Sequence, residues 1–157
     1  MKTDGLSINL ATVRKQYGLK DGVEAFVRHG VRGISPWREH VQELGMDEAA
    51  RILRHNGMKV TGYCRGGLFP AADAAGRQAA IDDNKRMIDE AAAIGADCII
   101  LIGGGLPQGS RDIAAARQMF ADGMAAILPA ARAANVPLAI EPLHPMYAAD
   151  RGCISLL

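Results

Sequence analysis

Two side chains that can carry a proton or bind a metal stand close together near the end of the sequence, between Val136 and Pro145. Glu141 and His144 each precede a proline, and a residue in that position is held in an extended conformation. The apolar run in front of Glu141 is typical of a buried strand, so both side chains are expected where that strand ends. A carboxylate placed there can serve catalysis or a ligand, but it can equally cap a helix or pair with an arginine.

The strand that leads to Glu141 has two different faces. Because side chains alternate along a strand, Ala139 and Glu141 share one face and Leu138 and Ile140 share the other. A small residue beside a carboxylate leaves room for another molecule. The pattern therefore favours a pocket on the Glu141 face.

The elements that position these residues follow a repeating order. Helix-like stretches end in Gly or Asn, which tolerate the left-handed conformation of a helix C-terminus, and a short apolar strand follows each of them. The sequence predicts five strands, at Leu6–Leu10, Val31–Ile34, Met58–Tyr63, Asp97–Ile102 and Val136–Ile140. Strands that alternate with helices form a parallel sheet with right-handed crossovers, so the predicted class is α/β in one domain, residues 1–157.

The last long helix has an amphipathic stripe that includes Phe120 and Ile127. Ser110 is the expected N-cap, and Asp112 is expected to lie in the first turn. Pro129 conflicts with a straight helix, so a kink or a break is predicted there.

Parallel βα units carry their chemistry at the carboxyl ends of the strands. Polar, aromatic and glycine-rich residues gather at these ends, in Asn9–Thr12, Ser35–Arg38, Tyr63–Gly67, Gly103–Gly105 and Glu141–His144. Trp37 after a strand more often lines a mouth than a core, whereas Arg65 could neutralise an anionic ligand or pair with a carboxylate. Cys64 is more typical of packing than of a nucleophile. The glycines match no phosphate-binding motif, so Gly103–Gly105 is interpreted as a turn.

Composition narrows the class of protein. The chain has 157 residues and a formal net charge of +1, which gives no indication of nucleic acid as a partner. No signal peptide is evident, and the longest strongly apolar run, Cys98 to Ile102, is too short to cross a bilayer. Three cysteines form no CxxC pair, so a reducing, cytoplasmic location is the expectation.

Three segments resemble the sugar phosphate isomerase/epimerase family, within the xylose isomerase-like TIM-barrel superfamily. They are Pro36-Trp37-Arg38, Cys64-Arg65-Gly66-Gly67-Leu68-Phe69-Pro70 and, most specifically, Ile140-Glu141-Pro142-Leu143-His144-Pro145-Met146-Tyr147-Ala148-Ala149-Asp150-Arg151. The resemblance covers essentially the whole chain. It implies a (β/α)₈ barrel, with Glu141 at the end of strand five as the first ligand of a divalent metal and as a catalytic carboxylate. It also places Trp37, Arg65 and His144 around the substrate, and Asn9 at the end of strand one is a further candidate.

The chain differs from the family in length. A barrel of this type needs about 250 residues, and the sequence stops just after strand five. About five of the eight βα units are therefore expected, with the other metal ligands on a half that is absent. Three explanations of the length remain open. The sequence is truncated, or another chain supplies the missing half, or the chain is a remnant without full activity. With both edges of such a sheet unpaired, we expect self-association or dependence on the missing half.

The resemblance implies a metal-dependent isomerase or epimerase that moves a proton next to the carbonyl of a sugar or polyol. Oxygen-rich ligands with one imidazole suit Mn²⁺, Mg²⁺ or Co²⁺, and Zn²⁺ remains open. Ser7, Asn9, Ala139 and Glu141 are then expected to face the barrel axis, and Leu6, Ile8, Leu138 and Ile140 the helices.

Two alternatives to this function remain open, and two others lack the residues that they require. An inosose-type dehydratase would use the same metal and carboxylates, and a non-catalytic partial barrel also remains open. A repair endonuclease of the superfamily needs zinc-binding histidines on early strands, where Ser35-Pro36-Trp37 and Tyr63-Cys64-Arg65 stand instead. A doubly wound nucleotide-binding domain needs a glycine fingerprint after its first strand, where Ala11-Thr12-Val13-Arg14 stands.

Overall fold

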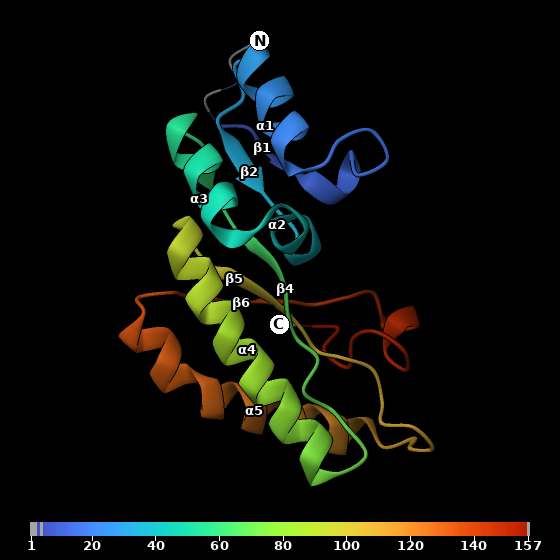
Figure 1. The fold of residues 1–157 in the computed structure, drawn as a ribbon. Coiled ribbons are helices and arrows are strands. Elements are labelled where there is room, and N and C mark those ends of the chain that lie inside the picture. The colour runs from blue at the N-terminus through green and yellow to red at the C-terminus, as the bar shows by residue number, and fades with distance from the viewer. Residues whose placement is uncertain (1–2, 4, 157) are drawn as a thin grey trace.

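The computed structural model describes residue 3 and residues 5–156 as an open, partial barrel (Figure 1). Its strands are β1 (Ser7–Asn9), β2 (Gly33–Ser35), β3 (Lys59–Val60), β4 (Tyr63–Gly67), β5 (Ile99–Ile102) and β6 (Leu138–Glu141). Its helices are α1 (Leu19–Arg28), α2 (Arg38–Leu44), α3 (Met46–His55), α4 (Ala74–Ile94) and α5 (Ile113–Ala133), with short 3₁₀ turns η1 (Leu10–Thr12) and η2 (Pro145–Tyr147). All strand pairs are parallel, in the orders β1-β2-β3 and β4-β5-β6. The predicted α/β class is confirmed.

The third predicted strand differs from the expectation. It is divided at Thr61 and Gly62 into β3, which pairs with β2, and β4, which pairs with β5. Residues 64–67, expected at the carboxyl end of this strand, form β4 together with Tyr63. Backbone hydrogen bonds on either side of the division, from Asp97 N to Val60 O and from Cys64 N to Pro36 O, join the two sheets. The segment therefore acts as one continuous strand, whose first part (β3) pairs with β2 and whose second part (β4) pairs with β5.

The predicted helix ends are confirmed. Gly30, Gly57, Gly95 and Asn135 have φ angles of 74°, 61°, 68° and 54°, in the left-handed region that ends helices. Each turn leads directly towards the strand that follows it.

The expected N-cap of the last helix is wrong, and of the kink or break predicted at Pro129 the structure shows no break. Asp112 is the N-cap of α5, because its carboxylate accepts a hydrogen bond of 2.9 Å from Ala115 N, while the Ser110 hydroxyl accepts from Asp112 N one step earlier. Pro129 lies inside α5, which continues to Ala133 without a break. The proline removes one backbone donor, and packing of the apolar face maintains the helix.

The register of the sheets confirms which residues face inwards. Paired residues of a parallel sheet point to the same face. In the pairing of β5 with β6, Ile99 is opposite Leu138, Leu101 is opposite Ile140, and Ile102 is opposite Glu141. Ile99 and Leu101 are buried on the helix side, so Glu141 points to the opposite, inner face. In β1, Ile8 pairs with the fully buried Ile34, and the Ser7 hydroxyl bonds that of Thr61 at 2.6 Å on the inner face. Leu6 lies before β1.

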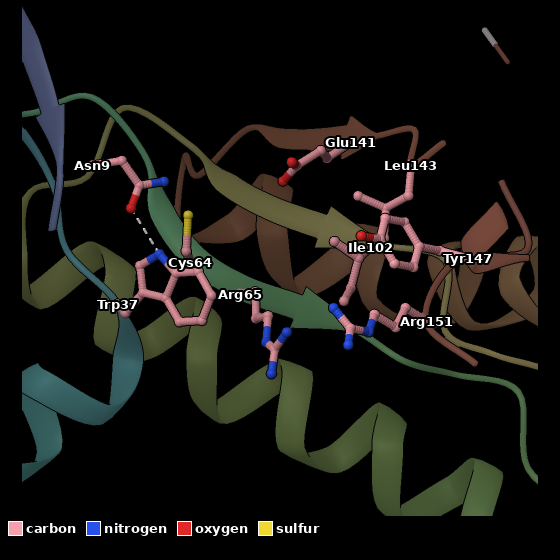
Figure 2. Close-up of a pocket in the computed structure, with 9 residues that line it drawn as sticks. All are labelled: Asn9, Trp37, Cys64, Arg65, Ile102, Glu141, Leu143, Tyr147 and Arg151. Atoms are coloured by element: carbon pink, nitrogen blue, oxygen red, sulfur yellow. Dashed lines mark hydrogen bonds between the residues drawn. The ribbon is translucent and has the colours of Figure 1, made fainter. Parts of the chain in front are cut away.

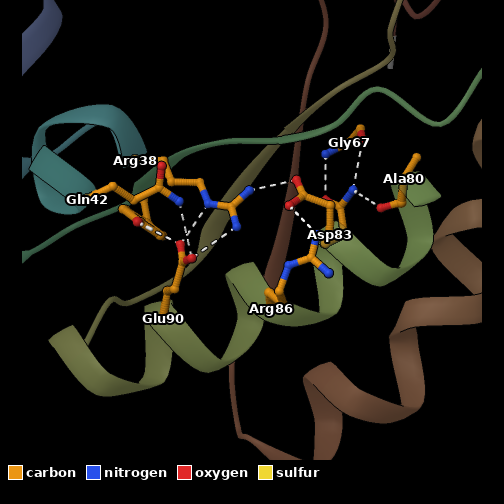
Figure 3. A network of polar contacts seen from close by, with 9 residues as sticks. Arg38, Gln42, Gly67, Ala80, Asp83, Arg86 and Glu90 are labelled. Atoms are coloured by element: carbon orange, nitrogen blue, oxygen red, sulfur yellow. Dashed lines mark hydrogen bonds and ion pairs between the residues drawn. The ribbon is translucent and has the colours of Figure 1, made fainter. Parts of the chain in front are cut away.

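A polar network ties α2 to α4 (Figure 3). Arg38 donates to both carboxylate oxygens of Glu90, at 2.7 and 2.9 Å, and to Asp83 at 2.6 Å. Tyr63 and Gln42 also donate to Glu90, at 3.0 and 3.4 Å. The side chains of Arg38 and Glu90 are only 15% and 16% exposed, so the network fixes the start of α2.

The network shifts the acidity of its members. Burial opposes the ionisation of Asp83, but the hydrogen bond and charge of Arg38 outweigh it and lower the pKa of Asp83. A lowered pKa in the folded state stabilises the fold above the ordinary pKa of aspartate, and this contribution is lost as the pH falls through the lowered value. Burial and the Glu90 charge raise the pKa of Tyr63, so its hydroxyl stays protonated and continues to donate.

The end of β4 is held on α4 by a buried amide. Asn84 accepts from Gly67 N at 2.7 Å and donates to Gly67 O at 2.8 Å and to Ala80 O at 2.9 Å (Figure 3). Gly67 has a φ of 89°, and a Cβ there would collide with the Ile102 carbonyl oxygen, so glycine is required at this position.

Gly123 provides a test of the packing between α5 and the core. Alanine normally stabilises a helix interior relative to glycine, but a Cβ at Gly123 would overlap the ring of the buried Phe69. We therefore expect Gly123→Ala to lower the free energy of unfolding by about 1–3 kcal/mol, measured by denaturant titration. Gly5→Ala, where nothing lies within 4 Å of the added Cβ, is the control and is expected to change little. A neutral or stabilising Gly123→Ala would contradict this packing.

Among the residues that the structure describes, no helix is long and apolar enough to cross a membrane.

Candidate functional site

A cavity of about 200 Å³ opens where the strands end on the inner face (Figure 2). Its lining comes from β1, β4, β5, β6 and the loops that follow β2 and β6. The lining residues are Asn9, Trp37, Cys64, Arg65, Ile102, Glu141, Leu143, Tyr147 and Arg151. The structure thus brings together four predicted site residues, Asn9, Trp37, Arg65 and Glu141.

The Asn9 side chain is oriented by two hydrogen bonds to its oxygen. Trp37 Nε1 donates to Asn9 Oδ1 at 2.9 Å, and Ala11 N donates to the same atom at 3.0 Å. Because the oxygen accepts both hydrogen bonds, the amide nitrogen points away from Trp37 into the cavity, as Figure 2 shows. Asn9 therefore offers N–H donors to a ligand, and Trp37 fixes their direction.

A β-bulge brings two consecutive residues into the cavity. In the pairing of β4 with β5, Cys64 is opposite Ile100 and Gly66 is opposite Leu101, so Arg65 is an extra residue in the ladder. Without the bulge, alternation would turn Arg65 to the face opposite Cys64. With it, the Arg65 guanidinium carbon lies 5.0 Å from the centre of the Trp37 ring, and both residues line the cavity.

Cys64 is suited to packing rather than nucleophilic attack. Its side chain is buried, and burial raises the pKa of the thiol by more than the Ser35 hydrogen bond lowers it, while the negative charge of Glu141 adds a smaller upward contribution. The thiolate is the reactive form of cysteine, so a raised pKa keeps Cys64 protonated and inert near neutral pH.

Glu141 is the one carboxylate among the described residues that line the cavity. It ends β6, pairs in register with Ile102, and is exposed to solvent within the cavity. Figure 2 shows its carboxylate directed towards the space between Cys64 and Ile102. A ligand in the cavity would meet this carboxylate on one side and the Asn9 amide on another.

The segment 143–154, which we name the return loop, closes one end of the cavity. It lies against the end of β5 through hydrogen bonds from Leu106 N to Ala149 O and from Cys153 N to Gly104 O, both 2.8 Å. A Cβ at Gly103 or Gly105 would collide with the backbone of the return loop. These glycines therefore allow close packing of two chain segments, and this packing places Tyr147 and Arg151 at the cavity.

Tyr147 and Arg151 are lining residues that were not predicted. Both belong to the segment that carried the family resemblance, but alternation along the strand says nothing about a return loop. Tyr147 and Arg151 are four residues apart, and residues at this spacing lie on one side of a helical turn. This spacing was the available signal in the sequence. The structure joins them, with the Arg151 guanidinium carbon 4.9 Å from the centre of the Tyr147 ring.

His144 is not among the residues that line the cavity. It is exposed, and its Nδ1 accepts a hydrogen bond of 3.2 Å from Met146 N at the start of η2. The observed role is that of a cap, and its contact with substrate stays a prediction.

The described residues do not form a metal site by themselves. Within residues 3 and 5–156, no group of three or more His, Cys, Asp or Glu side chains is arranged to hold a metal ion. Glu141 fits the role of a single ligand, and a complete site would need donors from elsewhere.

Comparison with known proteins identifies the family. A family model described as xylose isomerase-like TIM barrel matches residues 15–155. The chain belongs to this family. The predicted resemblance is thereby confirmed, and the open sheet is part of a xylose isomerase-like barrel. A search of curated proteins found no match.

Solved structures of the xylose isomerase-like fold superpose closely on the chain. Protein SMc04130 from Sinorhizobium meliloti 1021 is 61% identical with a TM-score of 0.96, and the match covers 98% of this chain and 56% of that one. A D-psicose 3-epimerase in the presence of D-fructose is 19% identical with a TM-score of 0.74, over 88% and 52% of the two chains. The IolI protein, crystallised with a zinc atom, is 19% identical with a TM-score of 0.73, and the match covers 88% of this chain and 52% of that one. The chain thus spans about half the length of these proteins.

Proposed function

We propose that the protein is an isomerase or epimerase of a sugar or polyol, in which Glu141 moves a proton at the carbon next to a carbonyl group. One observation carries the proposal. Glu141 lies at the carboxyl end of β6, on the inner face, in a cavity that also presents the Asn9 amide as a donor. Proton transfer of this kind needs a carboxylate beside the C–H bond and a donor near the carbonyl oxygen.

The chemistry of these two residues is complementary. The Glu141 carboxylate accepts the proton of the C–H bond, and the electron pair of that bond moves to the carbonyl oxygen, which yields an enediolate and a neutral glutamic acid. The Asn9 N–H group donates to the oxygen as its charge develops. Transfer of the hydroxyl proton of that carbon to the enediolate oxygen, with return of the carbon-bound proton to the former carbonyl carbon, completes an isomerisation. Epimerisation requires a second carboxylic acid on the opposite face, and the described lining holds only Glu141.

The comparisons support this reaction class. The similar structures include the D-psicose 3-epimerase and a 3-keto-D-glucoside 4-epimerase from E. coli, the latter 15% identical with a TM-score of 0.70 over 92% of this chain and 57% of that one. Their names describe inversion at a carbon of a sugar. Since the chain spans about half their length, the activity proposed is that of the whole protein.

A divalent metal, with Glu141 as one ligand, is part of the proposal. The zinc atom named for IolI supports it, and when bound such an ion would polarise the substrate oxygens. The described lining contributes one carboxylate, and the described residues contain no group of three His, Cys, Asp or Glu that could hold an ion, so the remaining donors are assigned to other parts of the assembled protein. Mn²⁺, Mg²⁺, Co²⁺ and Zn²⁺ all accept a carboxylate oxygen.

Metal content is a test that does not depend on turnover. We expect the natural protein that carries this chain to retain about one divalent ion after gel filtration, as is usual for catalytic metal sites with strong ligands. Glu141→Gln should lower the retained metal, measured by elemental analysis, because the amide oxygen is a weaker ligand. Glu43→Gln, on the exposed side of α2, is the matched control. Unchanged metal in Glu141→Gln would remove Glu141 from the ligand set.

The edge of the second sheet supports association with a further part of a barrel. β6 is the outer strand of the order β4-β5-β6, and Ile140 on it is 39% exposed. An unpaired apolar edge is a template for strand pairing. We assign the pairing partner to further strands of the same protein or to a second copy.

A cytoplasmic location is also proposed. Cys64, Cys98 and Cys153 are free thiols, which supports a reducing compartment.

The reaction class is tested by incubating the natural protein with a panel of aldoses, ketoses and cyclic polyol ketones and following each by NMR. Interconversion of a ketose with its epimer or with the matching aldose supports the proposal. Loss of water from the substrate instead would assign the protein to dehydratases.

A further inference from the structure

Two arginines in the cavity have the same unusual surroundings. Arg65 is stacked on Trp37 and Arg151 on Tyr147, with guanidinium carbons 5.0 and 4.9 Å from the ring centres. Both arginines line the cavity, one from the bulge of β4 and the other from the return loop. Figure 2 shows the two guanidinium groups on the side of β4 away from Glu141. Two chain segments thus converge to place paired positive charges opposite the carboxylate.

These guanidinium groups are not used by the fold. Arg65 makes no ion pair or hydrogen bond with any described residue beyond its contact with Trp37. Arg151 approaches only its neighbour Asp150, at 3.5 Å, and both of those side chains are more than 60% exposed. Arg38 shows the contrast, since all of its donor nitrogens bond carboxylates of α4. The stacked arginines keep their N–H edges free, the geometry that recognises an oxyanion.

We infer that the substrate carries a carboxylate group, which Arg65 and Arg151 bind while Glu141 acts on the carbon chain; the inference rests on the proposed function. Two positive charges and one negative charge leave the side chains of the lining with a net charge of +1 before any metal ion is counted, which favours an anionic ligand. The substrate class is therefore a sugar acid or keto-polyol acid. The aromatic rings hold the guanidinium planes, so less side-chain freedom is lost when the acid binds.

A carboxylate suits this cavity better than a phosphate. Phosphates are usually held by several backbone N–H groups at a glycine turn or a helix N-terminus. Here Gly67 N already donates to Asn84, and the glycines at 103–105 are packed against the return loop. Side-chain forks are the donors that remain, and they match the two oxygens of a carboxylate.

Binding of ligands that cannot react tests the inference separately from turnover. The natural protein is titrated by calorimetry with gluconate, with glucitol and with glucitol phosphate, which share a carbon chain and differ in one terminal group. Shorter aldonate and alditol pairs are included. We expect the acids to bind about tenfold or more tightly than the neutral polyols, with an affinity that falls as salt is added.

Substitution of each arginine assigns the effect. Arg65→Gln and Arg151→Gln should each reduce the preference for the acid about tenfold, with unchanged circular dichroism and binding of the neutral polyol. Arg51→Gln removes the same charge from the exposed face of α3 and should change nothing. Equal binding of acids and polyols would overturn the inference, and tighter binding of the phosphate would overturn the choice of carboxylate. A protein that selects acids but transfers no proton would contradict the proposed function alone.

Discussion

Replacing Glu141 with glutamine is expected to reduce turnover by a factor of about 10²–10⁴ and to leave the fold intact. Glutamine keeps the size and shape of the side chain but cannot accept the proton from carbon. Because Glu141 is exposed at the end of the edge strand β6 and has no hydrogen bond to a described side chain, its loss removes little that stabilises the fold. Steady-state kinetics on the natural protein and thermal unfolding of both forms are the measurements.

Two variants show whether the effect is specific. Glu43→Gln has the same change in charge outside the cavity and should keep full activity. His144→Ala should lower activity less than Glu141→Gln, because the structure places His144 at the cap of η2 rather than in the cavity. Equal losses in His144→Ala and Glu141→Gln would mean that the imidazole also takes part in the chemistry.

The second large effect is expected on stability, from Arg38→Met. This change removes the bidentate partner of Glu90 and the bond to Asp83. It leaves the largely buried Glu90 carboxylate without its cationic partner, whereas Asp83 is 46% exposed. Breaking a buried ion pair by removing one partner costs about 3–5 kcal/mol, and we expect a value near the lower end. The free energy of unfolding from denaturant titration measures it.

A surface variant in the same network provides the comparison. Arg86→Gln breaks an exposed pair with Asp83, at 3.0 Å and three residues away on α4, and should cost less than about 1 kcal/mol. If Arg38→Met were no more costly than Arg86→Gln, the network would not be what holds α2 to α4. Trp37, which immediately precedes Arg38 at the start of α2, would then be positioned by other contacts.

Much of the fold could be predicted because its signals are local. Gly30, Gly57, Gly95 and Asn135 end helices through their own backbone preferences, and the apolar runs that follow are strands in the structure. The bulge at Arg65 was not predictable in this way. It depends on how β4 pairs with β5, a contact between distant parts of the chain. Pro129 is the opposite case, where tertiary packing overrides a strong local preference.

The same distinction applies to the candidate site. Asn9 and Glu141 end strands and Trp37 follows one, and parallel strands bring their carboxyl ends to one edge, so topology was enough to group these three. Arg65 joins them only through the bulge of β4. Tyr147 and Arg151 reach the cavity only because the return loop packs on Gly103 and Gly105. Those glycines were interpreted as a turn, and their function in close packing depends on the segment that covers them.

Incorporation of solvent deuterium tests the central claim most directly. The natural protein is incubated in D₂O with a ketose or keto-polyol acid that it converts, and NMR follows the carbon-bound hydrogen next to the carbonyl. The account predicts exchange at that single carbon with the wild-type protein and at least about a hundredfold slower exchange with Glu141→Gln. Exchange at an undiminished rate in Glu141→Gln would contradict it.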